Sequence, residues 1–184
     1  MKVLAISGSL RAGSYNTALA RAAREIAPAG VDIELYNELG ALPPFDADTD
    51  GTEEPAAVGE LRRQIRSADA LLFVTPEYNG SIPGVLKNAV DWVSRPHRDA
   101  ALSNKTVAVA GATPGQYGAM WAQQDLRRVL SIAGARVIAG ELSVPRAHEV
   151  FDVEGRLVSP IVAERLRIHL AALVEQAVPA ALAA

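Results

Sequence analysis

The sequence contains no cysteine, and other residue types that carry chemistry are sparsely placed. None of its 184 residues can form a disulfide bond, act as a thiol nucleophile or hold a metal through a thiolate. The three histidines, His97, His148 and His169, lie far apart without the spacing of metal ligands, and we interpret them as surface or structural residues. No catalytic triad or carboxylate pair is legible. We therefore expect no metal site.

Long apolar runs and a strong excess of charge are also missing. No run approaches the ~20 apolar residues that a membrane span requires. The formal net charge is −3, with basic and acidic residues mixed along the chain. This balance excludes a nucleic-acid face and a polybasic membrane patch. The N-terminus leads directly into a predicted strand, so we expect no signal peptide and a cytoplasmic protein.

An acidic segment comes close to a calcium site without completing it. Asp46, Asp48, Asp50 and Gly51 begin like an EF-hand loop. Ala57 stands where the bidentate glutamate is required, so calcium binding is not expected. We interpret the segment as an acidic, turn-rich loop.

The glycine-containing loop after the first apolar run lacks the signatures of the common nucleotide-binding motifs. Gly8 and Gly13 have P-loop spacing, but Ser14 and Tyr15 stand where Lys and Ser/Thr are needed, which argues against triphosphate hydrolysis. Leu10 occupies the second glycine position of the G-x-G-x-x-G dinucleotide fingerprint. A site for a small phosphate monoester remains, or a polar turn without a ligand.

The residues that are present in this loop favour the phosphate site. A buried strand, a polar loop and a helix start present unpaired N–H groups and the positive end of a helix dipole. Ser9, Ser14 and Asn16 can add side-chain donors, and Arg11 can add a charged fork. This density of donors within eight residues favours a ligand over a plain turn.

Apolar runs alternate with helical patterns along the whole chain, which predicts an α/β doubly wound parallel sheet. We expect one domain over residues 1–184, with residues 179–184 as a frayed tail. Glu154-Gly155 predicts a hairpin turn within the irregular segment 145–159. The predicted strands are 3–6, 31–35, 70–74, 106–110 and 135–142, and the predicted helices are 17–27, 55–67, 83–94, 121–133 and 160–177.

Three loops should meet at one edge of this sheet. They are 7–16, 75–81 and 111–118, and each follows a predicted strand. Ligands of open α/β sheets bind at the carboxyl ends of the strands. One loop is suited to phosphate. The other two offer backbone amides, hydroxyls and an aromatic edge to a flat ligand with polar groups at its rim.

Two motifs in these loops carry a family resemblance. They are Gly8-Ser9-Leu10-Arg11-x-x-Ser14-x-Asn16 and the run from Pro76 to Trp92, PEYNGSIPGVLKNAVDW. With them the chain resembles the NAD(P)H-dependent FMN reductases of the flavodoxin-like fold, a group that includes quinone, azo-dye and chromate reductases. The resemblance implies a three-layer sandwich with a five-stranded parallel sheet in the order 2-1-3-4-5 and helices on both faces. It also implies homodimers or tetramers, with the cofactor near the subunit boundary.

The resemblance also assigns roles to residues. The third loop departs from the family pattern at Thr113-Pro114-Gly115, where Pro114 has no N–H to donate. The residues implied to bind FMN are Ser9, Arg11, Ser14 and Asn16 at the phosphate, Pro76, Glu77, Tyr78, Asn79 and Gly80 at the isoalloxazine edge, and Thr113, Gly115 and Gln116 facing the ring.

The implied reaction is hydride transfer from NADPH or NADH through FMN to a small-molecule acceptor such as a quinone, with the two substrates using one site in turn. The flavin would carry the chemistry, which agrees with the lack of catalytic side chains. The alternative is a non-enzymatic, flavodoxin-like FMN electron carrier. Such carriers are strongly acidic to steer towards basic partners, and a net charge of −3 fits that role poorly.

Overall fold

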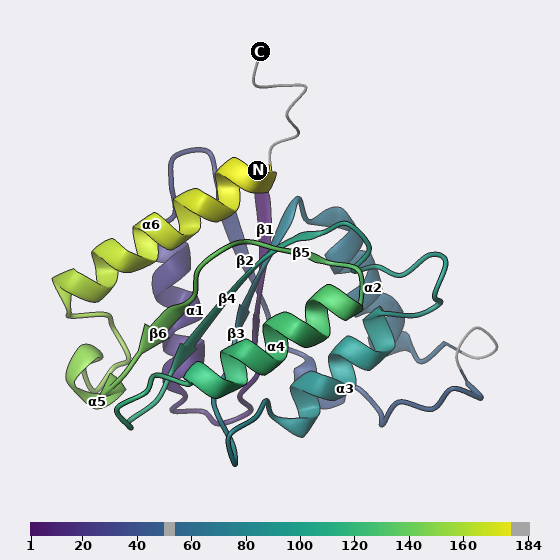
Figure 1. The fold of residues 1–184 in the computed structure, drawn as a ribbon, viewed down its shortest axis with the longest axis horizontal. Coiled ribbons are helices and arrows are strands. Elements are labelled where there is room, and N and C mark those ends of the chain that lie inside the picture. The colour runs from purple at the N-terminus through teal and green to yellow at the C-terminus, as the bar shows by residue number, and fades with distance from the viewer. Residues whose placement is uncertain (50–53, 178–184) are drawn as a thin grey trace.

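The chain is built in three layers, with one parallel sheet between two layers of helices (Figure 1). The computed structural model describes residues 1–49 and 54–177. Helices α1 and α6 pack on one face of the sheet, and α2, α3 and α4 pack on the other. The strands are β1 (Lys2–Ser7), β2 (Asp32–Tyr36), β3 (Ala70–Val74), β4 (Thr106–Ala112), β5 (Arg136–Val137) and β6 (Leu142–Val144). The helices are α1 (Tyr15–Glu25), α2 (Ala56–Ser67), α3 (Gly84–Val93), α4 (Met120–Ile132), α5 (Ala147–Val150) and α6 (Pro160–Ala177), and η1 (Leu39–Ala41) is a short 3-10 helix.

The order of the strands is the one that the sequence predicted. Hydrogen-bonded neighbours run β2-β1-β3-β4-β5, with every pair parallel, and β6 also pairs with β4. All residues of β3 and β4 are buried, because helices cover both faces of these strands. The flavodoxin-like architecture is thus confirmed. The order reverses between β1 and β3, so the predicted ligand loops meet at that edge.

The first helix begins earlier than predicted. Residues 17–27 were expected to be helical, whereas α1 runs from Tyr15 to Glu25. Ser14 explains the difference, because its hydroxyl oxygen accepts hydrogen bonds from the N–H groups of Asn16 and Thr17 and caps the helix. Asn16 therefore lies inside the first turn rather than in the loop.

The fifth strand is interrupted, which corrects the prediction of one strand over 135–142. Two short strands, β5 and β6, lie along the same edge of β4, and the chain between them turns away at Gly140, whose φ is +83°. Thr106 pairs with Arg136, but Ala110 pairs with Leu142, so the interrupted strand has two more residues than β4 over this stretch. The sequence offers one local sign of this break, Gly140, because a glycine inside a strand pattern often marks a bulge.

Side chains from both helical layers satisfy carbonyl groups at the interruption. Arg127 of α4 donates to the carbonyls of Ile138 and Gly140 at 2.9 and 2.6 Å. His169 of α6 is buried, and its Nε2 donates to the carbonyl of Val109 at 3.1 Å. Burial, offset only in part by this bond, lowers the pKa of His169 below its ordinary value of 6.5. His169 was predicted to be a surface or structural residue, and the carbonyl of Val109 is its specific partner in the structure.

The irregular segments contain one confirmed turn. Gly155 has a φ of +77° and donates its N–H to the carbonyl of Asp152, and Phe151 bridges Leu157 antiparallel across the turn. Asp50 and Gly51 of the acidic segment lie outside the described residues, as does the predicted tail at 179–184. In residues 1–49 and 54–177, no three acidic, histidine or cysteine side chains are grouped as metal ligands would be. Over the same residues, every helix is too short or too polar to cross a bilayer.

Candidate functional site

The three predicted loops meet around a small pocket at the carboxyl edge of the sheet. The pocket has a volume of about 130 Å³ and lies where the strand order reverses. Its lining includes eight of the twelve predicted site residues and leaves out Asn79, Gly80, Gly115 and Gln116. The residues that line it are Ser9, Arg11, Ser14, Tyr15, Asn16, Pro76, Glu77, Tyr78, Ala112, Thr113 and Pro114.

The first loop ends in a helix start with unused donors. Ser14 is buried, and its oxygen already accepts from two N–H groups, which leaves its own proton free to donate outward. Among the described residues of this loop, the N–H groups of Gly13, Ser14 and Tyr15 have no acceptor in the protein. These groups and the α1 dipole make this end of the pocket suited to an anion.

Arg11 and Ser9 flank the same end of the pocket. Arg11 is exposed and donates from Nη2 to the carbonyl of Gly13 at 3.0 Å, which holds the guanidinium over the loop while leaving other N–H groups for a ligand. The Ser9 hydroxyl accepts only one long contact, from the N–H of Arg11 at 3.4 Å. Both side chains can therefore reorient towards a phosphate.

Asn16 makes a connection that its predicted role did not include. It is 3% exposed, its Nδ2 donates to the carbonyl of Ala112 at 2.9 Å, and its Oδ1 accepts from the N–H of Ala112 at 2.9 Å. The amide thus satisfies both backbone groups at the end of β4. This pairing ties the start of α1 to the end of β4, across 96 positions of sequence.

The second loop contains a tight hairpin. Tyr78 and Ser81 exchange backbone hydrogen bonds of 3.0 and 3.1 Å, and Asn79 and Gly80 between them have φ values of +53° and +75°. Positive φ at both central residues defines a type I′ turn, for which Asn-Gly is the preferred sequence. Within the described chain, the N–H groups of Glu77, Asn79 and Gly80 have no acceptor, so three of the amides in this loop remain available.

Glu77 contacts α4 rather than solvent alone. Its Oε2 accepts from the N–H groups of Trp121 and Ala122 at 3.0 and 3.2 Å. By family resemblance, the sequence places Glu77 only at the isoalloxazine edge. The bond to α4 is one that sequence reasoning missed, because the partners are 44 and 45 residues away.

The third loop is anchored on its β6 side. Thr113 donates its N–H to the carbonyl of Val144, and the carbonyl of Thr113 accepts from Ala147. The carbonyl of Gly115 accepts from Arg146. The N–H of Thr113 is therefore committed to the protein, and Pro114 has none, so the loop offers a ligand its hydroxyl and the amides beyond Pro114.

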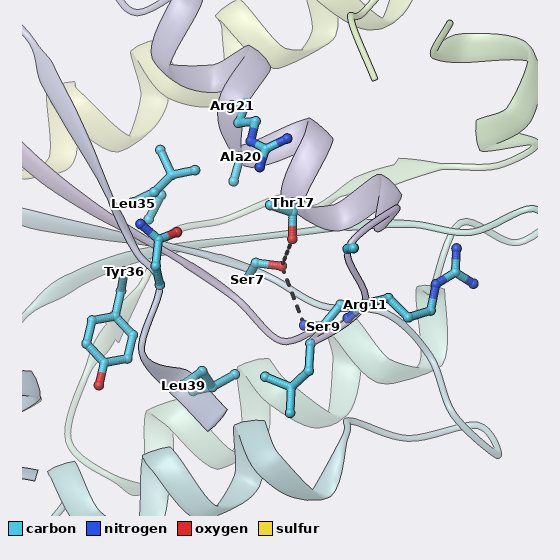
Figure 2. A pocket seen from close by; sticks show the side chains of 13 residues that line it. Ser7, Ser9, Arg11, Thr17, Ala20, Arg21, Leu35, Tyr36 and Leu39 are labelled. Carbon is cyan, nitrogen blue, oxygen red and sulfur yellow. Dashed lines mark hydrogen bonds between the residues drawn. The ribbon is translucent and has the colours of Figure 1, made fainter. Parts of the chain in front are cut away.

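A second hollow lies on the β2 side of the first loop. It has a volume of about 200 Å³, and Ser9 and Arg11 belong to the walls of both hollows. Figure 2 shows the hydroxyls of Ser7 and Thr17 joined by a hydrogen bond of 2.9 Å inside it, while the Arg11 side chain extends away from Leu35. The polar groups within this hollow are thus partly paired with one another, and Arg11 is directed towards the other side.

Tyr36 lies at the end of β2 and is buried. In the described part of the chain its hydroxyl has no hydrogen-bond partner. Burial, with the charges of Glu38 and Glu60, raises the pKa of Tyr36 to about 12. Figure 2 shows the hydroxyl directed away from Ser9, so it takes no part in the anion site.

Exposed aromatic side chains gather at the two segments that Glu77 joins. The large exposed hydrophobic residues of the described chain include only three aromatics, Tyr78, Tyr117 and Trp121. The rings of Tyr117 and Trp121 lie edge to face with centroids 4.8 Å apart. Tyr78 lines the pocket itself.

Comparison with known proteins places this arrangement among flavin enzymes. A family model described as NADPH-dependent FMN reductase matches residues 1–149, which include all three loops. An NAD(P)H-dependent FMN reductase of Pseudomonas aeruginosa is 43% identical over 174 residues, covering 94% of this chain and 93% of that protein. A quinone reductase of Escherichia coli strain K12 is 41% identical over 139 residues, covering 75% of this chain and 73% of that protein. Among solved structures, the flavoenzyme FerB of Paracoccus denitrificans, an NAD(P)H:(acceptor) oxidoreductase, superposes with a TM-score of 0.87 at 32% identity and with 96% of each chain covered.

Proposed function

Because the chain belongs to the NADPH-dependent FMN reductase family, we propose that the pocket between its three loops is where FMN binds and where NAD(P)H and a quinone-like acceptor react. Like its relatives, the chain is an oxidoreductase, and it uses FMN and NAD(P)H. The observation that carries the assignment of the site is the convergence, in one pocket, of unpaired N–H groups at the start of α1 with the loop that forms the Asn79-Gly80 hairpin.

The donors of the pocket fit a phosphate monoester joined to a flat, polar ring. The N–H groups of Gly13, Ser14 and Tyr15, the hydroxyls of Ser9 and Ser14 and the guanidinium of Arg11 together offer a phosphate more donors than it has oxygens. At the other end, the unpaired amides of Glu77 and Asn79 are suited to carbonyl and ring-nitrogen acceptors. FMN has this combination of groups, and when bound it supplies the hydride chemistry for which the chain has no side chain.

Asn16 has a separate place in this proposal. Because both polar atoms of its amide are bonded to Ala112, Asn16 supports the wall of the pocket. It acts on the phosphate only through the shape of that wall. Thr113 contributes its hydroxyl from the third loop. Gly115 and Gln116, which lie outside the pocket lining, contribute backbone amides.

The acceptor is proposed to be a flat aromatic molecule of the quinone class that takes the place of the nicotinamide. Because the acceptor takes the place of the nicotinamide in this pocket, the two substrates bind in turn and the kinetics are ping-pong. The exposed rings of Tyr78, Tyr117 and Trp121 support this choice, because aromatic faces bind flat apolar substrates favourably.

We further propose that the enzyme is a homodimer or tetramer, with residues 1–184 forming one FMN-binding domain in the cytoplasm, where NAD(P)H is produced. A groove of about 860 Å³ between α3 and α4 supports self-association, since its lining combines apolar Val90, Val129 and Ile132 with paired charges such as Lys87 and Asp91. Ile132 in this groove is 76% exposed. Sedimentation velocity of the wild type and of Ile132→Asp tests this: a dimer that dissociates in the variant supports the groove, and a monomeric wild type refutes the oligomer.

The experiment that tests the function is an anaerobic absorption titration. Purified protein is mixed with FMN and then with NADPH or NADH. A bound flavin spectrum that bleaches rapidly and returns on adding a quinone supports the reductase. Bound flavin that stays oxidised with both nicotinamides would instead indicate a carrier reduced by a protein partner, and the absence of binding would refute the site.

A further inference from the structure

Helix α4 begins without a cap from its own segment. The residue before it, Ala119, has a left-handed backbone (φ +62°, ψ +33°) and makes no side-chain bond to the helix. The first N–H groups of a helix have no partner within it and need an acceptor from elsewhere. In α1 the neighbouring Ser14 provides that acceptor, whereas α4 has none of its own.

Glu77 provides the missing acceptor from the second loop. Its Oε2 accepts from the first-turn N–H groups of Trp121 at 3.0 Å and Ala122 at 3.2 Å. A carboxylate at this position also interacts favourably with the positive end of the helix dipole. The cap of α4 is therefore part of the loop that lines the pocket.

A second bond fastens the same loop to the same helix. The hydroxyl of Ser81 donates to Oδ2 of Asp125 at 2.7 Å. The bonds from Glu77 and Ser81 both reach the N-terminal half of α4. The hairpin between Glu77 and Ser81, including the amides of Asn79 and Gly80, is thus attached to α4 at both of its ends.

We propose that Glu77 is a positioning residue that couples the flavin-binding hairpin to the start of α4, so that FMN binding and the order of this helix end stabilise one another. The inference rests on the proposed function. It assigns Glu77 a role through its side chain that is separate from any contact of its backbone with FMN. The same bond fixes the aromatic pair Tyr117 and Trp121 relative to the pocket, because Trp121 supplies one of the two capped N–H groups.

The test compares four forms of the whole chain: the wild type, Glu77→Ala, Glu77→Gln and the control Glu164→Gln. Glu164 is an exposed glutamate on α6 that pairs with Arg167, so its change removes a charge without touching the pocket. FMN affinity is measured by quenching of flavin fluorescence in apoprotein. Hydrogen–deuterium exchange of the first turn of α4 is measured with and without FMN.

We expect Glu77→Ala to weaken FMN binding roughly tenfold and to speed exchange at the start of α4 about fivefold, because loss of a cap frays a helix end. FMN should slow exchange at residues 121 and 122 in the wild type and not in Glu77→Ala. Glu77→Gln keeps an acceptor oxygen and should retain affinity within about threefold, and Glu164→Gln should match the wild type.

Other outcomes separate the failure of this inference from failure of the proposed function. If the wild type binds no FMN, the function fails, and unchanged exchange at residues 121 and 122 in Glu77→Ala apoprotein would refute the capping role on its own. If the wild type binds FMN and Glu77→Ala binds it equally well with only a lower melting temperature, Glu77 is merely structural and the coupling is refuted. If Glu77→Ala does not fold, the wild type decides: exchange at residues 121 and 122 that FMN does not slow would refute the coupling.

Discussion

Replacing Asn16 by alanine separates two roles that this side chain could have. The sequence alone places Asn16 among the phosphate donors, whereas the structure pairs its amide with both backbone groups of Ala112. Removal of a phosphate donor would change FMN affinity and leave the apoprotein stable. Removal of an internal connection would destabilise the apoprotein itself.

The expected loss of stability follows from the burial of the pair. Asn16 is 3% exposed and Ala112 is 2% exposed, so water does not replace the missing amide freely. Leaving a buried donor or acceptor unpaired costs about 1–3 kcal/mol, and this change leaves one of each. We expect Asn16→Ala to lower the free energy of unfolding by roughly 2–6 kcal/mol. For a domain of this size, a loss of about 3 kcal/mol lowers the melting temperature by roughly 6–12 °C.

The assay is urea and thermal unfolding of flavin-free protein, with Asn88→Ala as the matched control. Asn88 makes the same pair of bonds, donating to the carbonyl of Pro43 and accepting from the N–H of Phe45, but it is only half-buried. Water can reach its partners, so Asn88→Ala should cost about 1–2 kcal/mol. The reasoning is refuted if Asn16→Ala unfolds like the wild type, and a selective loss of FMN affinity in that case would restore the phosphate role.

Three further changes test other parts of the structure. Arg11→Ala should weaken FMN binding roughly ten- to a hundredfold, since a charge-assisted hydrogen bond contributes about 1.5–3 kcal/mol, and unchanged affinity in an apoprotein titration would remove Arg11 from the site. Gly118→Ala should cost at least ~3 kcal/mol in urea unfolding, because its φ is +59° and a Cβ would lie 2.6 Å from a backbone nitrogen of β6. Gly30→Ala, with a φ of +79° and open space around it, should cost only about 1 kcal/mol, and equal losses would refute the argument from contact. The lowered pKa of His169 means that the unfolded state binds the proton more readily, so stability should fall as pH drops below 6.5, by up to ~1.4 kcal/mol per pH unit. His169→Gln should flatten that dependence below pH 6.5, the exposed control His148→Gln should keep it, and equal slopes in all three proteins would contradict the assignment.

Local patterns in the sequence were sufficient for the parallel α/β sheet and for the edge at which the three loops meet, whereas the order of the strands came from the family resemblance. The uninterrupted apolar residues of β3 and β4 are buried on both faces, as such runs predict. The loops that follow β1, β3 and β4 meet because parallel strands bring their carboxyl ends to one edge. The Asn79-Gly80 pair was also a sufficient signal for the type I′ hairpin, although it was interpreted only as part of a motif.

Contacts between distant segments were not predictable in the same way. Asn16 has a partner 96 positions away, and Glu77 has partners 44 and 45 positions away, so no local pattern identifies either bond. Ser14, three residues before the predicted helix start, could have placed the first residue of α1 correctly, because serine is a favoured capping residue. Arg127 and His169, which bond to carbonyls at the break in the fifth strand, come from two separate helices that only the folded structure brings together.

That break also limits how the length of the chain can vary at this edge. Side chains in a strand alternate between faces with a period of two, so one extra residue would exchange the buried and exposed sets of everything beyond it. Two extra residues leave the alternation intact, and Ile138, Leu142 and Val144 all pack in the same core cluster on either side of the break. An insertion of two residues within the paired part of this edge therefore keeps the same side chains in the core, whereas an insertion of one exchanges them. Evolution or an engineer could lengthen this chain here by pairs of residues while leaving the three loops of the pocket in place.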